Sequence, residues 1–183
     1  MRYIVERINV NQVETMVDRL ANIIIKNEVY FCELDSVAGD GDFGMSVAKG
    51  FKQLKAEWED LSRDNVGAFL KDAGMIITEH CGGASGPIWG SAFRGAAKAA
   101  KGKEDVTLIE IAEMFEAGIA GIQKRGKAQL GDKTLLDALI PAAVSIREGA
   151  EKSYNIAPTF VNAASSAREG AEKTKTMVAN KGR

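Results

Sequence analysis

The chain has few of the residues that mark several common protein classes. Among its 183 residues are two cysteines, Cys32 and Cys81, and a single histidine, His80. Two cysteines are too few for a disulfide framework, and their surroundings do not resemble a zinc site. The formal net charge of -1 argues against a broad nucleic-acid-binding surface. The apolar runs are too short to cross a bilayer, so we expect no membrane segment.

What the chain does contain is ordinary for a globular protein. Apolar residues make up 45% of the sequence and charged residues 27%. The charged stretch 1–10 lacks the apolar centre of a signal peptide, so we expect a cytoplasmic protein. The length fits one domain over residues 1–183, with residues 1–10 as an amino-terminal extension.

Nearly every periodic stretch has the spacing of an amphipathic helix, and we find no convincing strand alternation. Capping boxes are expected at Asn11 with Glu14 and at Thr107 with Glu110, and Asp64 or Asn65 can cap a third helix. We predict an all-α antiparallel bundle of about seven helices. They cover residues 13–24, 44–58, 66–77, 88–101 and 108–122, a stretch after Thr134 that contains Pro141, and residues 158–179, where Phe160, Val161, Ala164, Ala167, Ala171 and Val178 should point inward.

An acidic, glycine-rich loop over residues 34–44 is the most informative stretch. It places Asp35, Asp40 and Asp42 within eight positions, with no lysine or arginine among them. Crowded carboxylates repel one another unless a positive charge neutralises them, and oxygen ligands suit Mg²⁺ or Ca²⁺. An EF-hand beginning at Asp40 would need a glycine at 45 and a glutamate at 51, where the chain has Met45 and Phe51. Taken alone, this loop is consistent with two interpretations, a Mg²⁺ site and a solvated turn.

A second glycine-rich stretch, residues 82–87, ends at Pro87, which fits the first turn of a helix. Backbone N–H groups at such a start can bind phosphate, although a plain interhelical turn has the same pattern. Residues 126–134 nearly spell a P-loop, but Asp132 is inserted before Lys133 and no strand precedes them. We therefore interpret that segment as a loop that caps the next helix through Asp132 or Thr134.

In order and spacing, four motifs resemble the nucleotide-binding L subunit of dihydroxyacetone kinases (DhaL). They are Gly39-Asp40-Gly41-Asp42-Phe43-Gly44, Gly82-Gly83-Ala84-Ser85-Gly86-Pro87, Lys124-Arg125-Gly126-Lys127-Ala128 and Gly131-Asp132-Lys133-Thr134. The resemblance extends from about Asn11 to Arg183. It implies a barrel of antiparallel helices that holds the nucleotide at one end. Relatives continue past this point into a lid segment and one more helix, so we expect a bundle without that final helix, which leaves an apolar groove.

The resemblance also implies roles for particular residues. Asp35, Asp40 and Asp42 would hold two Mg²⁺ ions that bridge to the phosphates of ADP or ATP. The remaining nucleotide contacts would come from Phe43, Gly44, Met45, Ser46, Ala84, Ser85, Gly126, Leu135 and Arg183, and Arg183 would also supply positive charge for catalysis. Phe43 replaces a histidine common in relatives, and Ser46 and Val47 replace the usual asparagine and methionine. Lys127 and Lys133 either add charge to the site or lie in solvent.

Two branches of the family use the nucleotide differently. In one, bound ADP takes a phosphoryl group from a phosphohistidine-carrying protein of the phosphoenolpyruvate phosphotransferase system and passes it to dihydroxyacetone on a K subunit. In the other, ATP is consumed. A separate L chain with one histidine resembles the first branch, with the ATP-consuming kinase and a non-catalytic nucleotide-binding regulatory partner as alternatives. His80 itself is expected at a helix end.

Overall fold

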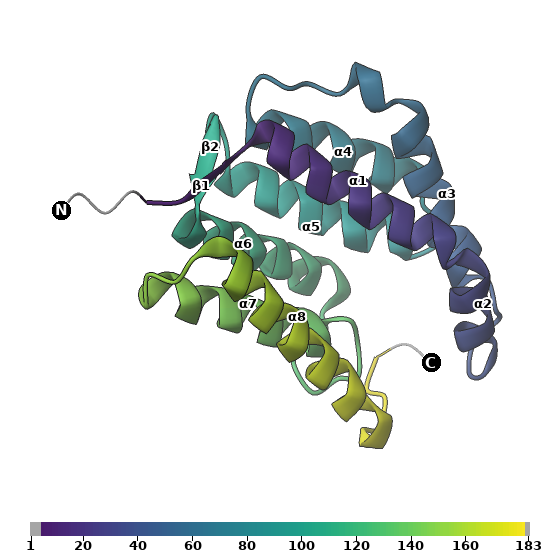
Figure 1. Cartoon of the computed structure of the whole chain (residues 1–183). Coiled ribbons are helices and arrows are strands. Elements are labelled where there is room, and N and C mark those ends of the chain that lie inside the picture. The colour runs from purple at the N-terminus through teal and green to yellow at the C-terminus, as the bar shows by residue number, and fades with distance from the viewer. Residues whose placement is uncertain (1–4, 182–183) are drawn as a thin grey trace.

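The structure is a computed structural model that describes residues 5–181. Within this range the chain forms eight α-helices, two short strands and two 3₁₀ turns (Figure 1). The helices are α1 (Val10–Lys26), α2 (Glu28–Ser36), α3 (Phe43–Ala56), α4 (Val66–His80), α5 (Ser85–Ala99), α6 (Leu108–Gly126), α7 (Leu136–Glu151) and α8 (Ile156–Lys173). The strands are β1 (Arg7–Asn9) and β2 (Asp105–Thr107), and the 3₁₀ turns are η1 (Trp58–Asp60) and η2 (Thr174–Thr176).

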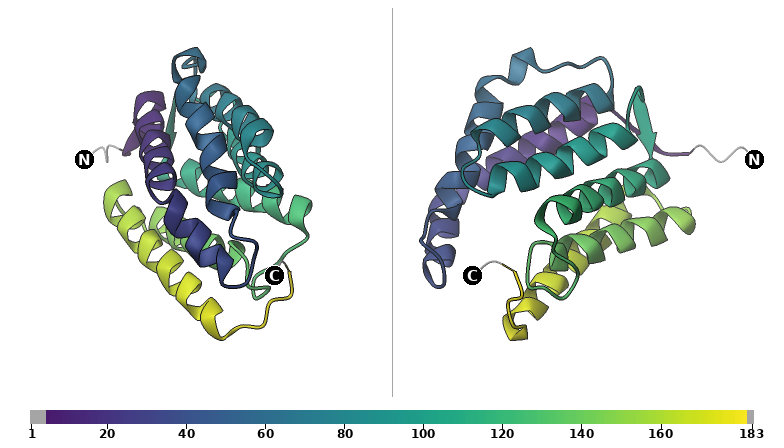
Figure 2. Two further views of the ribbon diagram at one scale, coloured as in Figure 1. Left: turned by 90° about the vertical axis from the view of Figure 1, so that its right-hand side faces the viewer. Right: turned by 180° about the vertical axis from the view of Figure 1, so that it is seen from behind.

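Helices that follow one another in sequence pack side by side, which is the arrangement that short connections favour. From α3 to α8, each helix contacts the next along the chain, and α1 packs on α3 and α4. Because consecutive helices run antiparallel, the starts of α3, α5 and α7 lie at the same end of the bundle as the ends of α2, α4, α6 and α8 (Figure 2). That end is the one that carries the motifs singled out above. The predicted all-α bundle is confirmed.

The expectation of no strands was wrong in one place. β1 pairs antiparallel with β2, with Arg7 opposite Thr107 and Asn9 opposite Asp105. Strands of three residues are too short to show the alternation that identifies a strand in sequence. Residues 7–9 of the expected amino-terminal extension are therefore paired, and Ile8 between them is buried.

One of the two predicted capping boxes is displaced and the other is confirmed. Asn9 caps α1 reciprocally with Gln12, whereas Asn11 with Glu14 had been expected. Both pairs have the same spacing, and the pairing of β1 with β2 selects the earlier one. Thr107 and Glu110 form the predicted box at the start of α6, and Asn65 caps α4 by accepting a hydrogen bond from the Ala68 N–H.

The helix count was low by one because α2 was not recognised. None of its nine residues is buried, so it lacks the inward apolar stripe on which helix prediction depends. The inward face of α8 was predicted correctly at Phe160 and Ala167, which pack against the main core, and misassigned elsewhere. The buried residues of α8 are Ile156, Thr159, Ala163 and Gly170, whereas Val161 is 67% exposed. The helix ends at Lys173, short of the expected 179, so Val178 lies beyond it and is 81% exposed. Ala164 and Ala171 are exposed as well.

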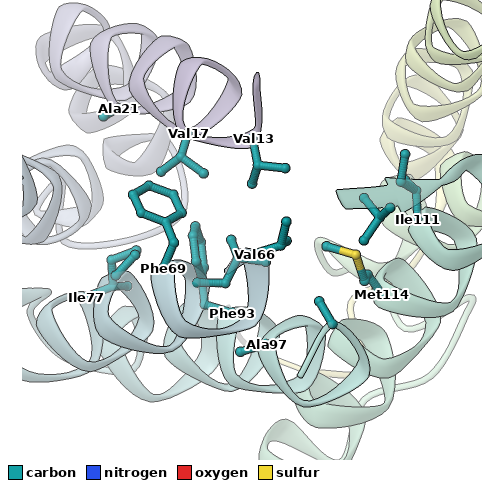
Figure 3. Close-up of a cluster of buried hydrophobic side chains, with 14 of the residues drawn as sticks. Val13, Val17, Ala21, Val66, Phe69, Ile77, Phe93, Ala97, Ile111 and Met114 are labelled. Atoms are coloured by element: carbon teal, nitrogen blue, oxygen red, sulfur yellow. The ribbon is translucent and has the colours of Figure 1, made fainter. Parts of the chain in front are cut away.

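The main core lies between α1, α3, α4, α5 and α6. Phe51, Leu54, Phe69 and Ile77 are completely buried. Figure 3 shows Val13 and Val17 of α1 pointing toward Phe69 of α4, with Met114 of α6 beyond. An apolar groove of about 260 Å³ opens beside this core, lined among others by Val17, Trp89, Phe93, Met114, Phe115 and Phe160. No helix within residues 5–181 is long and apolar enough to span a membrane.

Candidate metal and nucleotide site

The three aspartates predicted to act together do lie together. Each of Asp35, Asp40 and Asp42 offers a carboxylate oxygen, and these oxygens lie within 4.8 Å of one another. Asp35 is half-buried, while Asp40 and Asp42 are exposed. One detail differs from the expectation, since Asp35 belongs to the last turn of α2 and not to a loop. A helix and the turn before the next helix thus supply the three groups, which is a firmer support than a loop alone.

The Asp35 carboxylate is held in place by the backbone of the turn that follows it. Its Oδ2 accepts hydrogen bonds from the N–H groups of Gly41, at 2.9 Å, and Phe43, at 3.4 Å. Gly41 adopts a φ of 76°, a conformation that favours glycine. A Cβ on Gly39 would lie 2.3 Å from Asp35 Oδ1. The turn therefore wraps closely around this carboxylate and carries Asp40 and Asp42 back toward it.

Gly44 allows the start of α3 to approach α2 closely. A Cβ at this position would lie 1.9 Å from the Glu28 carbonyl oxygen and 2.8 Å from the Cys32 nitrogen. Lys52 of α3 also forms an ion pair with Glu28, at 2.5 Å. These contacts fix α2 against α3 and so fix Asp35 relative to Asp42.

The second glycine-rich stretch lies directly beside this turn. The Gly82 N–H donates to the Ser46 carbonyl at 2.9 Å, and a Cβ on Gly82 would lie 2.8 Å from Ser46 Oγ. Gly83 has a φ of 53°, and a side chain there would meet nothing within 4 Å. Helix α5 then begins at Ser85, and the side chain of its N-cap residue Ala84 makes no capping hydrogen bond. The amino end of α5, with its N–H groups and partial positive charge, thus lies next to the acidic turn.

The end of α6 and the start of α7 form a third part of the same region. A Cβ on Gly126 would lie 3.1 Å from Cδ1 of Ile88, in the first turn of α5. Ile88 and Leu135 pack on a small apolar cluster whose buried members are Ile122, Ala128 and Leu136. Gly126 and Leu135, both predicted to line a nucleotide pocket, therefore lie at the same end of the bundle as Ser85.

Other predicted residues have varied positions. Phe43 is 40% exposed, with its ring 6.1 Å from that of Phe31, and Met45 is 57% exposed. Lys133 Nζ donates to the Met177 carbonyl at 3.0 Å, so its side chain contacts the segment after α8. His80 is the last residue of α4, as expected. Arg183 lies outside the described residues.

Sequence reasoning missed one residue of this region, Asp137. It is 2% exposed, and its carboxylate accepts hydrogen bonds from the loop between α6 and α7. The signal was present, because Thr134 and Asp137 have the spacing of a capping box just before an apolar run. Of the two residues predicted to cap this helix, Asp132 accepts from the Gln129 N–H within the loop, whereas Thr134 Oγ1 accepts from the Leu136 N–H at 3.2 Å.

The chemistry of the aspartate cluster suits a hard divalent cation. Three carboxylate oxygens within 4.8 Å of one another match the oxygen ligands that Mg²⁺ prefers. Mg²⁺ commonly keeps some coordination positions for phosphate oxygens or water. The adjacent N–H groups at the start of α5 provide a place where such phosphates could lie.

Comparisons with known proteins agree on one family. A family described as "DAK2 domain" matches residues 37–183. The chain is 34% identical to the PEP-dependent dihydroxyacetone kinase, ADP-binding subunit DhaL of Escherichia coli, over 94% of this chain and 82% of that protein. It is 36% identical to the PEP-dependent dihydroxyacetone kinase 2, ADP-binding subunit DhaL of Listeria innocua, over 88% of this chain and 75% of that protein.

Longer proteins match as well. The chain is 32% identical to triokinase/FMN cyclase of Mus musculus, over 94% of this chain and 30% of that protein. Among solved structures, the dihydroxyacetone kinase from C. freundii in complex with AMP-PNP and Mg²⁺ superposes with a TM-score of 0.76 at 25% identity. That superposition covers 98% of this chain and 32% of the other, so the chain spans about a third of the solved protein.

Proposed function

Because the chain belongs to the DAK2 domain family, we propose that it is the ADP- and Mg²⁺-binding subunit of a phosphoenolpyruvate-dependent dihydroxyacetone phosphotransferase. The observation that carries the proposal is the convergence of the Asp35, Asp40 and Asp42 carboxylates beside the amino end of α5. The names of the two DhaL relatives support the nucleotide and the phosphoryl donor. The solved structure with AMP-PNP and Mg²⁺ supports a nucleotide–metal site in this fold.

In this proposal the three aspartates hold two Mg²⁺ ions against the phosphates of the nucleotide. When bound, Mg²⁺ neutralises the phosphate oxygens and stabilises the charge that spreads over them during transfer. Two backbone N–H groups orient the carboxylate of Asp35 for this role. The tight turn then brings Asp40 and Asp42 to the same point.

The backbone around the aspartates would hold the nucleotide phosphates. N–H groups at Ala84 and Ser85 contribute fixed dipoles at the start of α5, and residues 43–46 approach from the start of α3. Gly126 and Leu135 would contact the rest of the nucleotide from the α6–α7 side. Arg183 is proposed as a further contact on the basis of the family resemblance.

Phosphoryl transfer in this site depends on positioning and charge, with no covalent intermediate on the chain. A phosphohistidine P–N bond of a phosphotransferase-system protein breaks as a P–O bond forms to the terminal phosphate of ADP, which makes ATP in place. The terminal P–O bond of that ATP would then break as a new one forms to a hydroxyl oxygen of dihydroxyacetone on the K subunit, with the hydroxyl proton released to water, which would restore ADP. The proposed reaction takes place in the cytoplasm.

Both steps need a partner protein at the end of the bundle that carries the aspartates, and α2 offers a surface for such a partner. Val29, Tyr30, Leu34 and Val37 are 53–85% exposed on or directly after this helix, beside Asp35. Exposed apolar groups gathered near a functional site are typical of protein–protein contacts. This surface supports the proposed association with a K subunit and a phosphohistidine-carrying protein.

An ATP-consuming kinase is the second candidate, favoured by the match to part of triokinase/FMN cyclase. A coupled assay separates the two. The purified chain is mixed with Mg²⁺, catalytic ADP, a K subunit, dihydroxyacetone, phosphoenolpyruvate and the phosphotransferase proteins, without added ATP. We expect dihydroxyacetone phosphate to form. Product that forms only with stoichiometric ATP would identify the ATP-consuming kinase, and no product under either condition would contradict a catalytic role.

A further inference from the structure

Asp137 lies in the first turn of α7, beneath the loop that joins α6 to α7. Its side chain is 2% exposed, and both carboxylate oxygens accept hydrogen bonds from that loop. Oδ1 accepts from the Gly131 N–H at 2.6 Å, and Oδ2 accepts from the Thr134 N–H at 2.8 Å. The Asp137 carboxylate therefore bridges the two ends of the turn of residues 131–134 through hydrogen bonds.

The turn that Asp137 spans has a backbone conformation that is costly without support. Gly131 has a φ of 95°, and Lys133 has a φ of 61° although it carries a side chain. Two N–H groups point at two acceptor atoms of one side chain. An asparagine would offer one acceptor and turn a donor toward the other N–H, so this arrangement requires a carboxylate.

The backbone of Asp137 is packed against the neighbouring helix α8. A Cβ on Gly170 of α8 would lie 2.1 Å from the Asp137 carbonyl oxygen, so α8 lies directly against the start of α7. None of the ion pairs found among residues 5–181 involves Asp137. A buried carboxylate without a cation is unfavourable unless its oxygens are hydrogen-bonded, and here the loop N–H groups supply those bonds.

The segment after α8 holds the same loop from outside. The Asn180 N–H donates to the Asp132 carbonyl at 3.2 Å, and Lys133 Nζ donates to the Met177 carbonyl at 3.0 Å. The views in Figure 2 place this segment, the loop after α6 and the turn after α2 at one end of the molecule. The loop is thus fixed from two sides, at the end of the molecule that also carries the acidic turn (Figure 2).

From these contacts we propose that Asp137 is a positioning residue that holds the loop of residues 127–135 in the conformation that receives the nucleotide. The inference rests on the proposed function, because the loop begins beside Gly126 and ends at Leu135, the two residues proposed to contact the nucleotide on this side. Asp137 is buried beneath the loop and acts on the nucleotide through the loop backbone.

The test compares Asp137→Asn with Asp132→Asn, which makes the same charge change within the same loop. Three quantities are measured: the Kd for ADP in Mg²⁺ by calorimetry, the Kd for Mn²⁺ alone, and the exchange rates of the Gly131 and Thr134 amides in ADP-free protein by NMR. For Asp137→Asn we expect at least a tenfold higher Kd for ADP, at least tenfold faster exchange of both amides, and a Kd for Mn²⁺ within twofold of the wild type. For Asp132→Asn we expect a Kd for ADP within threefold of the wild type.

A Kd for ADP within threefold of the wild type in Asp137→Asn would overturn the inference, as would an equal loss in both variants. Should Asp137→Asn fail to fold, the exchange rates of the Gly131 and Thr134 amides in the wild type test the inference instead. The inference requires the Gly131 and Thr134 amides to be protected at least tenfold before ADP is added, and protection that arises only with ADP would contradict it. A wild-type chain that binds no ADP would refute the proposed function, and the amide exchange would still report on the loop.

Discussion

At the scale of single residues, the acidic turn depends on two glycines, one for its backbone conformation and the other for its lack of a side chain. Gly41 supplies a backbone conformation with φ of 76°, whereas Gly44 has an ordinary helical conformation and supplies space. The missing side chain at Gly44 is what lets the backbones of α2 and α3 touch. This contact determines how far Asp35 lies from Asp42.

Replacing Gly44 with alanine should therefore damage the site more than the fold. The new Cβ would overlap the Glu28 carbonyl, and we expect a loss of about 1–3 kcal/mol in the free energy of unfolding, the usual cost of overpacking. We also expect a Kd for Mn²⁺ at least tenfold higher, because α2 must shift with Asp35. Urea unfolding and Mn²⁺ titration followed by electron paramagnetic resonance measure the two effects. Lys49→Ala, at an exposed position of the same helix, should change neither, and wild-type Mn²⁺ affinity in Gly44→Ala would show that the close approach is unimportant.

The sequence was a good guide to these residues where chemistry is concentrated in a short stretch. Asp35, Asp40 and Asp42 were found together because eight positions of chain cannot separate them far. Asp137 was missed although its spacing from Thr134 is that of a capping box, and its second contact, with the Gly131 N–H, follows from the loop conformation and is not visible in the sequence. The sequence did not decide whether Lys127 and Lys133 contribute to the site. Lys133 donates to the Met177 carbonyl, a contact that depends on how the chain folds back after α8 and that the sequence does not show.

At the scale of elements, the start of α6 is held by several hydrogen bonds and ion pairs. Glu110 accepts from the backbone N–H and the hydroxyl of Thr107 and from Lys103 Nζ, the last at 2.5 Å. Arg7 of β1 lies 3.7 Å from the same carboxylate and pairs with Asp105 of β2. These contacts join the strand pair, α6 and the connection before it.

Burial alone would raise the pKa of Glu110, but the hydrogen bonds from Lys103 and Thr107 outweigh it and lower the pKa from 4.5 to about 2. A folded-state pKa below the unfolded value means that the stabilisation is complete above about pH 4.5 and is lost as the pH falls toward 2. We expect Glu110→Gln to lower the free energy of unfolding by on the order of 1 kcal/mol at pH 6, because water screens the charge of this partly exposed side chain.

The difference between wild type and Glu110→Gln should shrink as the pH is lowered from 5 to 3, which urea unfolding at each pH can follow. Glu113→Gln makes the same charge change at an exposed position of α6 and serves as the control. A difference that stays constant over this range would show that the Glu110 carboxylate is not the source of the stabilisation.

Elements with an apolar stripe were predictable, and elements without one were not. The helices that became α3, α4, α5 and α6 were found near their observed bounds because each buries one face. α2 was missed because it buries none of its residues, and β1 and β2 were missed because their three residues are stabilised by pairing across 98 positions of sequence. In α8, alanines lie on several sides of the helix, so their spacing did not identify the inward face, and Val161, expected inside, is exposed.

At the scale of the whole molecule, function follows from the alternating direction of the helices. The antiparallel order brings the end of α2, the starts of α3 and α5, the end of α6 and the start of α7 to one end of the bundle. The family resemblance implied this gathering at one end, and the short connections between antiparallel helices account for it. The distances within the site required the three-dimensional structure, because they depend on close backbone contacts such as those at Gly44 and Gly82.

The aspartates of the site lie outside the main core, so we expect the helices to stay folded when the site is empty. The main core includes Phe51, Phe69 and Phe93, whereas Asp40 and Asp42 are exposed at one end. A change at an aspartate should therefore affect ligands and leave the helices intact.

Native mass spectrometry of the purified chain with Mg²⁺ and ADP, comparing wild type with Asp40→Asn, is the most direct test of the central claim. Asp60→Asn, at an exposed position of η1 outside the aspartate cluster, is the matched control. The account predicts that wild type and Asp60→Asn retain one ADP with two Mg²⁺, and that Asp40→Asn retains neither while its helical circular dichroism is unchanged. Equal ADP retention by Asp40→Asn, or a wild-type chain that carries no nucleotide, would contradict it.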